Sequence, residues 1–298
     1  MQSGAGELKH LVLAIGLALW GSYLPGQSKL TLVQTSNVVW KLPHAWFGGF
    51  SGIETNDNGE TLYLLSDRGT LAQARLFREH DKITSIQLLS QVTLRNANGA
   101  PLQGAFRDAE GLAIASDGRA FVSFEFRHRV ARLNLITGRT TRLPDHADFA
   151  DFSTNSGLEA LAIHPDGRLF TLAESRASVP DKLPLYAFDH GAWRIVDNLE
   201  ASGGFRPVGA DIDSHGYLYL LERAITPLGF RSQIRRFDLN RTPAPSVTLL
   251  SSLPATYDNL ESLSVWQDSN GRTRLTLISD DNFFSLQATQ IVEFLLTE

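Results

Sequence analysis

The feature that most constrains the fold is a unit of about 50 residues that occurs five times along the chain. In its clearest copy, two apolar runs at 158–163 and 168–173 flank a Pro-Asp-Gly turn, a pattern that predicts a β-hairpin. Glu159 lies at the start of the first run, and Glu174 follows the second. Because the start of one hairpin strand and the end of the next lie together, we expect these two carboxylates to be side by side.

Each of the other four copies has the same order: an opening acid, a strand, a turn with glycine, a second strand and a closing acid. The opening acids are Glu54, Glu110, Glu159, Asp211 and Glu261, and the closing acids are Asp67, Glu125, Glu174, Glu222 and Asp280. Repeats of this length with several short strands each are typical of β-propellers. We therefore predict an all-β propeller that forms a single domain over residues 28–298.

The number of blades follows from counting strands. The third and fourth copies each have room for four strands, whereas the fifth copy ends after its third strand, at 290–296. A strand within residues 29–42 is expected to supply the missing fourth, which would close the ring and hide two sheet edges. The prediction is five four-stranded blades, and six blades remain an alternative if residues 86–107 contain a further hairpin.

Composition excludes several classes of protein. The chain has 298 residues, a formal net charge of -5 and no basic stripe or tail, which argues against a nucleic-acid binder. It has no cysteine, so disulfides, zinc–thiolate sites and thiol catalysis are excluded, although the compartment stays open. We expect a monomer that binds a small-molecule substrate.

The N-terminal segment is interpreted separately from the fold. An apolar run at 11–20 follows Lys9 and His10; it is too short to span a bilayer securely and fits the hydrophobic region of a secretory signal. Glu7 weakens the positive region that such a signal needs, so a buried or disordered extension is the alternative. Residues 1–27 are therefore interpreted as a signal peptide or extension, and export to the periplasm or outside the cell is expected.

The acids suggest a metal site. The first strand of a propeller blade lines the central channel, so the opening acids should form an inner ring and the closing acids an outer ring. Like charges this close cannot all stay ionised without compensation. Calcium takes six to eight oxygen ligands and suits such a cluster, whereas magnesium requires a stricter octahedron. We predict that calcium binds to the inner ring, which consists of Glu54, Glu110, Glu159, Asp211 and Glu261.

Arginines offer a second form of compensation. Four of them follow a closing acid by one or two positions: Arg68, Arg127, Arg176 and Arg223. One interpretation is that they form ion pairs that join neighbouring blades, which would explain the outer ring better than the inner one. The other is that they bind substrate by holding phosphate oxygens in a bidentate manner.

Several motifs resemble those of the phytase-like family, whose members are called "esterase-like activity of phytase" proteins. They are Gly-Phe-Ser-Gly-Ile-Glu54, Ser-Asp67-Arg68-Gly, Asp108-Ala-Glu110-Gly-Leu-Ala, Gly-Leu-Glu159-Ala-Leu-Ala, Asn-Leu-Glu261-Ser-Leu-Ser and Ser-Asp280-Asp-Asn-Phe. The similarity covers residues 45–296. It implies a propeller, export, and a hydrolase that acts on an ester or phosphoester. β-Propeller phytases use calcium to bridge carboxylates and phosphate, but their motifs do not align with this chain residue by residue.

These observations define two hypotheses about function. In the first, calcium held by the inner acids acts as a Lewis acid and phosphate template, and a carboxylate, Glu159 or Glu110, activates water. In the second, the protein is a non-catalytic ligand-binding propeller with a structural calcium ion. A serine-esterase mechanism is not favoured, because no Gly-x-Ser-x-Gly elbow is present.

Overall fold

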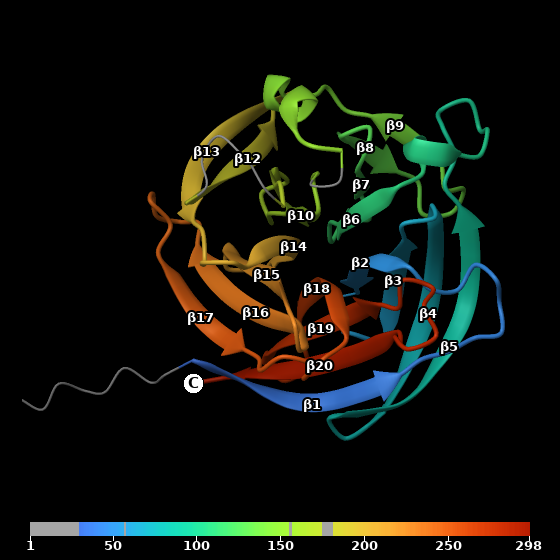
Figure 1. Ribbon diagram of the computed structural model, residues 1–298, viewed down its shortest axis with the longest axis vertical. Coiled ribbons are helices and arrows are strands. Elements are labelled where there is room, and N and C mark those ends of the chain that lie inside the picture. Colours follow the sequence, from blue (N-terminus) through green and yellow to red (C-terminus); the bar gives the residue numbers. More distant parts are fainter. Residues whose placement is uncertain (1–29, 57, 155–156, 175–180) are drawn as a thin grey trace, which may run out of the picture.

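A computed structural model describes residues 30–56, 58–154, 157–174 and 181–298. In these ranges the chain forms twenty strands and two short 3-10 helices, η1 (Gly104–Phe106) and η2 (Ala147–Asp151). The strands form five antiparallel sheets of four strands each, arranged around a central axis (Figure 1). The predicted five-bladed propeller is therefore confirmed. The signal or extension predicted for residues 1–27 lies outside the described residues.

Four blades consist of four consecutive strands each, ordered from the axis outwards. Blade 1 contains β2 (Phe50–Thr55), β3 (Thr61–Ser66), β4 (Thr70–Glu79) and β5 (Lys82–Thr93). Blade 2 contains β6 (Ala109–Ile114), β7 (Ala120–Phe124), β8 (Arg129–Leu133) and β9 (Thr140–Arg142). Blade 3 contains β10 (Ala160–Ile163), β11 (Leu169–Leu172), β12 (Lys182–Asp189) and β13 (Ala192–Glu200). Blade 4 contains β14 (Arg206–Ile212), β15 (Tyr217–Thr226), β16 (Gly229–Asp238) and β17 (Ser246–Ser251).

Blade 5 joins the two ends of the propeller. It contains β18 (Asn259–Gln267), β19 (Thr273–Asp280), β20 (Gln290–Thr297) and, outermost, β1 (Thr31–Val39). Strand β1 pairs antiparallel with β20 along its length, as predicted for the N-terminal strand (Figure 1). The six-blade alternative is wrong, because residues 86–107 contribute the end of β5 and a loop rather than a further sheet.

Small residues allow the innermost strands to pack closely around the axis. A Cβ added at Gly111 would lie 2.7 Å from the Cβ of Leu161 in the next blade. One added at Gly209 would lie 2.8 Å from the Cα of Ser262 in the blade after it. Gly52 meets blade 2 in the same way. These contacts fix which residues of each inner strand are equivalent, and therefore which side chains reach each end of the channel.

Among the described residues, no helix is long and apolar enough to cross a lipid bilayer. The apolar core is divided into clusters between adjacent blades, such as the one around Phe121, Tyr186 and Trp193. Each blade is therefore held mainly by its two neighbours, and the strand ends at the channel are rigidly placed.

Candidate metal and active site

One end of the channel holds a cavity of about 270 Å³ that is lined mainly by carboxylates. The residues that line it are Ser51, Asp67, Asp108, Glu110, Glu125, Phe126, Glu261 and Asp280. They come from blades 1, 2 and 5, at the starts of inner strands and the ends of the strands beside them. We call this end the acidic mouth. The opposite end, where the first hairpin of each blade turns, is the turn end.

The packing residues explain which opening acids reach the acidic mouth. Glu110 directly precedes Gly111, which packs against the next blade. Glu159 and Glu261 precede the corresponding small residues of blades 3 and 5. Three of the five predicted inner acids are therefore brought together at one end.

The expectation of a single five-membered inner ring is wrong for Glu54 and Asp211. Each lies three positions further along its inner strand than the residue equivalent to Glu110. Glu54 accordingly pairs with Tyr63, close to the turn of its hairpin. Both acids line a different cavity, of about 550 Å³, at the turn end. The acids are not at equivalent positions of the five repeats, whereas the glycines that pack against the next blade are. The residues equivalent to Glu110, directly before Gly52 and Gly209, are Ser51 in blade 1 and Val208 in blade 4.

The two carboxylates at the turn end are buried and satisfied by hydrogen bonds. Glu54 accepts one from the backbone N–H of Ile114 at 3.2 Å and one from Ser264 Oγ at 3.1 Å. Asp211 accepts one from the backbone N–H of Val265 at 2.6 Å. Burial raises the pKa of Asp211 to about 7. These bonds join neighbouring inner strands, which is a structural role.

Four of the five predicted outer acids lie at the acidic mouth: Asp67, Glu125, Glu174 and Asp280. The fifth, Glu222, does not. Its side chain is 0% exposed and forms a bidentate ion pair with Arg235, with both N–O distances at 2.6 Å. The strand register explains this, because Gly209 pairs with Leu221 and the residue two positions later is Arg223 rather than an acid.

Arg223 therefore occupies the outer position in blade 4. Its guanidinium forms an ion pair with the carboxylate of Glu261 in blade 5 and donates to Asn259 Oδ1 at 2.6 Å. For Arg223, the interpretation as an ion pair between blades is the correct one. Arg206 also pairs with an acid of the mouth, Glu174, at 3.6 Å, so two arginines compensate part of the acidic charge.

The remaining predicted arginines differ in position. Arg68 is exposed, and its guanidinium carbon lies 3.1 Å from the centroid of the Phe283 ring. Arg127 is exposed and lies 5.6 Å from the centroid of Phe106. Both belong to loops at the rim of the acidic mouth. Arg176 lies outside the described residues.

Crowding of carboxylates has a clear electrostatic effect. Burial and the charges of Glu159 and Asp108 raise the pKa of Glu110 well above its usual range. Burial is also the main cause that raises the pKa of Glu125 and of Asp280 to about 7. Burial and the charge of Asp67 raise the pKa of Asp108 to about 6. These groups cannot all be ionised together unless a cation joins them.

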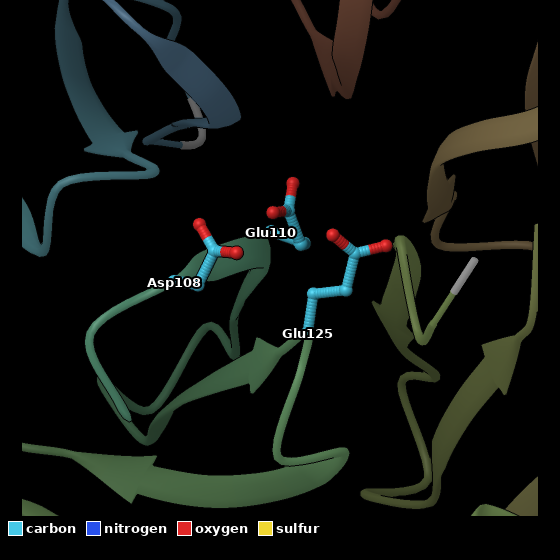
Figure 2. A group of neighbouring side chains, drawn as sticks. All are labelled: Asp108, Glu110 and Glu125. Carbon is cyan, nitrogen blue, oxygen red and sulfur yellow. The ribbon is translucent and has the colours of Figure 1, made fainter. Parts of the chain in front are cut away.

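Three of the acids are arranged as a cation would require. One oxygen from each of Asp108, Glu110 and Glu125 lies within 4.8 Å of the others, and the side chains point toward one another (Figure 2). Oxygens that bind one calcium ion at 2.3–2.6 Å are at most about 5 Å apart, so the spacing fits. An all-oxygen donor set favours calcium or magnesium over zinc. Sequence reasoning missed Asp108 as a ligand, although it begins the Asp-Ala-Glu motif.

His128 packs against the loop that positions Glu125 at the acidic mouth. Its Nε2 lies 3.0 Å from the carbonyl oxygen of Ser153, to which it donates. A Cβ added at Gly157 would lie 2.4 Å from His128 Nδ1, so the ring packs directly against this glycine. The backbone N–H of Gly157 in turn donates to Glu125 Oε1 at 3.2 Å. The histidine therefore holds the loop that positions Glu125.

Together, the fold and the site define a five-bladed β-propeller whose channel ends in a carboxylate cluster suited to a hard divalent cation. The chain belongs to the phytase-like family, described as "esterase-like activity of phytase", whose family model matches residues 45–283. No curated protein sequence matches the chain.

Several solved structures are similar at low identity. A PQQ-bound aldose sugar dehydrogenase from Streptomyces coelicolor is 12% identical over 91% of this chain and 99% of that one, with a TM-score of 0.49. A gluconolactonase from Xanthomonas campestris is 18% identical over 82% and 72%, with a TM-score of 0.43. A virginiamycin B lyase from Staphylococcus aureus is 13% identical over 84% and 71%, with a TM-score of 0.44. At these scores the similarities carry no argument about activity.

Proposed function

We propose that this protein is a hydrolase that acts on a phosphate or carboxylic ester at the acidic mouth, with calcium as its cofactor. The observation that carries the proposal is the meeting of eight carboxylates at one end of the channel, of which, within the described part of the chain, only Glu261 and Glu174 pair with an arginine, Arg223 and Arg206 respectively. Membership of a family described by esterase-like activity supports the reaction class.

The ligands of the ion would be Asp108, Glu110 and Glu125, with Asp67, Glu261 and Asp280 lining the same cavity. When bound there, calcium supplies a positive charge that polarises an ester oxygen. Arg223 would hold the Glu261 carboxylate in place through their ion pair. Arg68 and Arg127, at the rim, would attract and orient an anionic substrate group.

Glu159 is the candidate general base. It stands at the inner position of blade 3, beside but outside the three carboxylates whose oxygens lie within 4.8 Å of one another. Burial and the charges of Glu174 and Glu261 raise its pKa well above the usual range, which makes a carboxylate a stronger base. Of the two residues that sequence analysis offers for this role, Glu110 is better placed as a ligand.

The proposal includes the setting of the protein. Export through the segment at 1–27 would place the chain in the periplasm or outside the cell, where calcium-binding modules work with dissociation constants of about 10⁻⁴–10⁻³ M. A monomer suffices, because every side chain invoked comes from one chain.

The test is a hydrolysis assay with 4-nitrophenyl phosphate and 4-nitrophenyl acetate, in calcium and in chelator. We expect turnover that requires calcium and that falls by roughly 10²-fold or more in Glu159→Gln. Glu54→Gln is the matched control, since it changes a buried carboxylate at the turn end, and it should keep full activity. Absence of turnover with both esters, together with a calcium-dependent rise in melting temperature, would instead support the binding propeller with a structural ion.

A further inference from the structure

Among the described residues that line the cavity at the acidic mouth, one has an apolar side chain, Phe126. This ring directly follows the candidate ligand Glu125 and is 43% exposed. An apolar ring held open to a carboxylate-lined cavity loses the favourable burial available to a phenylalanine elsewhere in the fold. Its position therefore calls for an explanation in terms of what occupies the cavity.

The backbone at Phe126 adds a second observation. Its φ is +50°, in the left-handed region that residues with bulky side chains rarely adopt. Such a conformation costs of order 1–3 kcal/mol and persists where the surroundings enforce it, often at functional sites. Here the N–H of Phe126 donates to the carbonyl oxygen of Thr154 at 3.3 Å, which anchors the turn. Glycine would fit this position without strain, yet the chain has phenylalanine there.

A second phenylalanine has the same character beside the closing acids of blades 1 and 5. Phe283 has a φ of +51° and follows Asn282, whose φ is +48°. A Cβ added at Gly49 would lie 2.5 Å from Phe283 Cε2 and 2.4 Å from Asp67 Oδ1, so the ring abuts a carboxylate that lines the cavity. The guanidinium of Arg68 stacks on this ring.

We propose that these two aromatic rings bind the apolar part of the substrate, and that Phe126 is a specificity-determining residue. The inference rests on the proposed function and narrows it: the substrate is an ester whose phosphoryl or acyl centre lies at the carboxylate cluster and whose attached group is an aryl ring or alkyl chain. Highly phosphorylated polyols fit poorly, because the mouth is lined by carboxylates and its half-buried arginine, Arg223, is already paired with Glu261.

The test uses two inert phosphonates, which resemble both a phosphate ester and the tetrahedral intermediate of carboxylic ester hydrolysis. Binding of benzylphosphonate and methylphosphonate to the calcium-loaded full chain would be measured by titration calorimetry. We expect benzylphosphonate to bind roughly tenfold more tightly, as burial of one aromatic ring predicts. In Phe126→Gly this preference should fall by roughly tenfold, while the affinity for methylphosphonate stays unchanged.

Two controls make the test decisive. Phe284→Ala removes another phenylalanine ring at the same end, 55% exposed but not lining the cavity, and should leave the preference intact. Phe126→Gly should melt no lower than the wild type, because glycine relieves the left-handed backbone. Equal binding of both phosphonates, no binding of either, or an unchanged preference in Phe126→Gly would overturn the inference. Selective binding without any ester turnover would refute the hydrolase alone.

Discussion

Two groups of acids, those in the hairpin turns at the turn end and those at the acidic mouth, are in opposite electrostatic states. At the turn end, hydrogen bonds from Arg168 outweigh burial and lower the pKa of Asp166 to about 2. Hydrogen bonds from Arg274 and Arg272, again against burial, lower the pKa of Asp268. At the acidic mouth, burial raises the pKa of Glu125 and of Asp280 to about 7.

The difference lies in where the compensating charge comes from. An acid in a hairpin turn, such as Asp166 or Asp268, has an arginine two to six residues away in its own hairpin, so local sequence satisfies it. The buried Glu54 and Asp211 instead accept hydrogen bonds from neighbouring inner strands, and burial raises the pKa of both. An acid at the mouth faces other acids across the channel, and packing between blades brings them together. The mouth differs from the site of Glu54 and Asp211 in the number of acids that raise one another's pKa, and such a cluster of perturbed carboxylates in a cavity is typical of a functional site.

The largest expected effect comes from removing an arginine that already compensates the charge of a buried carboxylate. Arg235→Met would leave Glu222 buried without a cation and should destabilise the protein by about 3–5 kcal/mol. The measurement is denaturant unfolding. The double variant Arg235→Met with Glu222→Met is the control and should recover most of this loss. A single variant no less stable than the double variant would show that Glu222 is not held as an ion.

The next largest effect is expected from calcium, which would compensate the carboxylates of the acidic mouth when it binds from solution. Calcium at 100 times its dissociation constant should stabilise the wild type by about 2.7 kcal/mol, measured as a rise in melting temperature that chelator reverses. Glu110→Gln should lose most of this rise, because it removes a candidate ligand. Glu54→Gln, which alters the turn end, should keep it. An equal calcium-dependent rise in melting temperature in the two variants would contradict the assignment of the calcium site to the acidic mouth.

The free energy of unfolding should change with pH in the opposite direction to that seen in ordinary acid unfolding. Because the pKa of Glu125 and of Asp280 is about 7 in the folded chain, and lower when unfolded, the folded state binds more protons between about pH 4.5 and pH 7. Calcium-free stability should therefore fall as pH rises through this window, by of order 1–3 kcal/mol. Calcium and Glu125→Gln should each flatten the profile. Calcium-free stability that rises between pH 5 and pH 7 would contradict this assignment.

The smallest effect is expected at the turn end. Asp166 accepts hydrogen bonds from Arg168 through its backbone N–H at 3.0 Å and its Nε at 2.8 Å, on an exposed turn. Asp166→Ala should destabilise the protein by no more than about 1 kcal/mol and leave calcium affinity unchanged. Denaturant unfolding and calcium titration measure both. A drop in calcium affinity would mean that the two ends are coupled.

Sequence alone predicted the fold because its signals are local. Turn residues, alternating strands and the missing fourth strand of the last repeat define five blades without knowledge of tertiary contacts. The site was predicted in part: Glu110, Glu159 and Glu261 reach the acidic mouth as expected, since each directly precedes the small residue that packs against the next blade.

The rest of the site depends on packing that the repeat pattern does not reveal. Glu54 follows Gly52 closely enough to resemble an opening acid, but the contact of that glycine with blade 2 places the carboxylate at the other end. Glu222 resembles a closing acid, but pairing of Gly209 with Leu221 moves Arg223 into that place. Aligning the repeats on small residues rather than on acids would have avoided both errors.

The most direct test of a cation site at the acidic mouth is anomalous diffraction from a crystal grown in calcium. A peak within about 2.3–2.6 Å of oxygens from Asp108, Glu110 and Glu125 is the expected result. A peak beside Glu54 and Asp211 at the turn end, or no peak at either end when calcium exceeds millimolar concentration, would contradict the account.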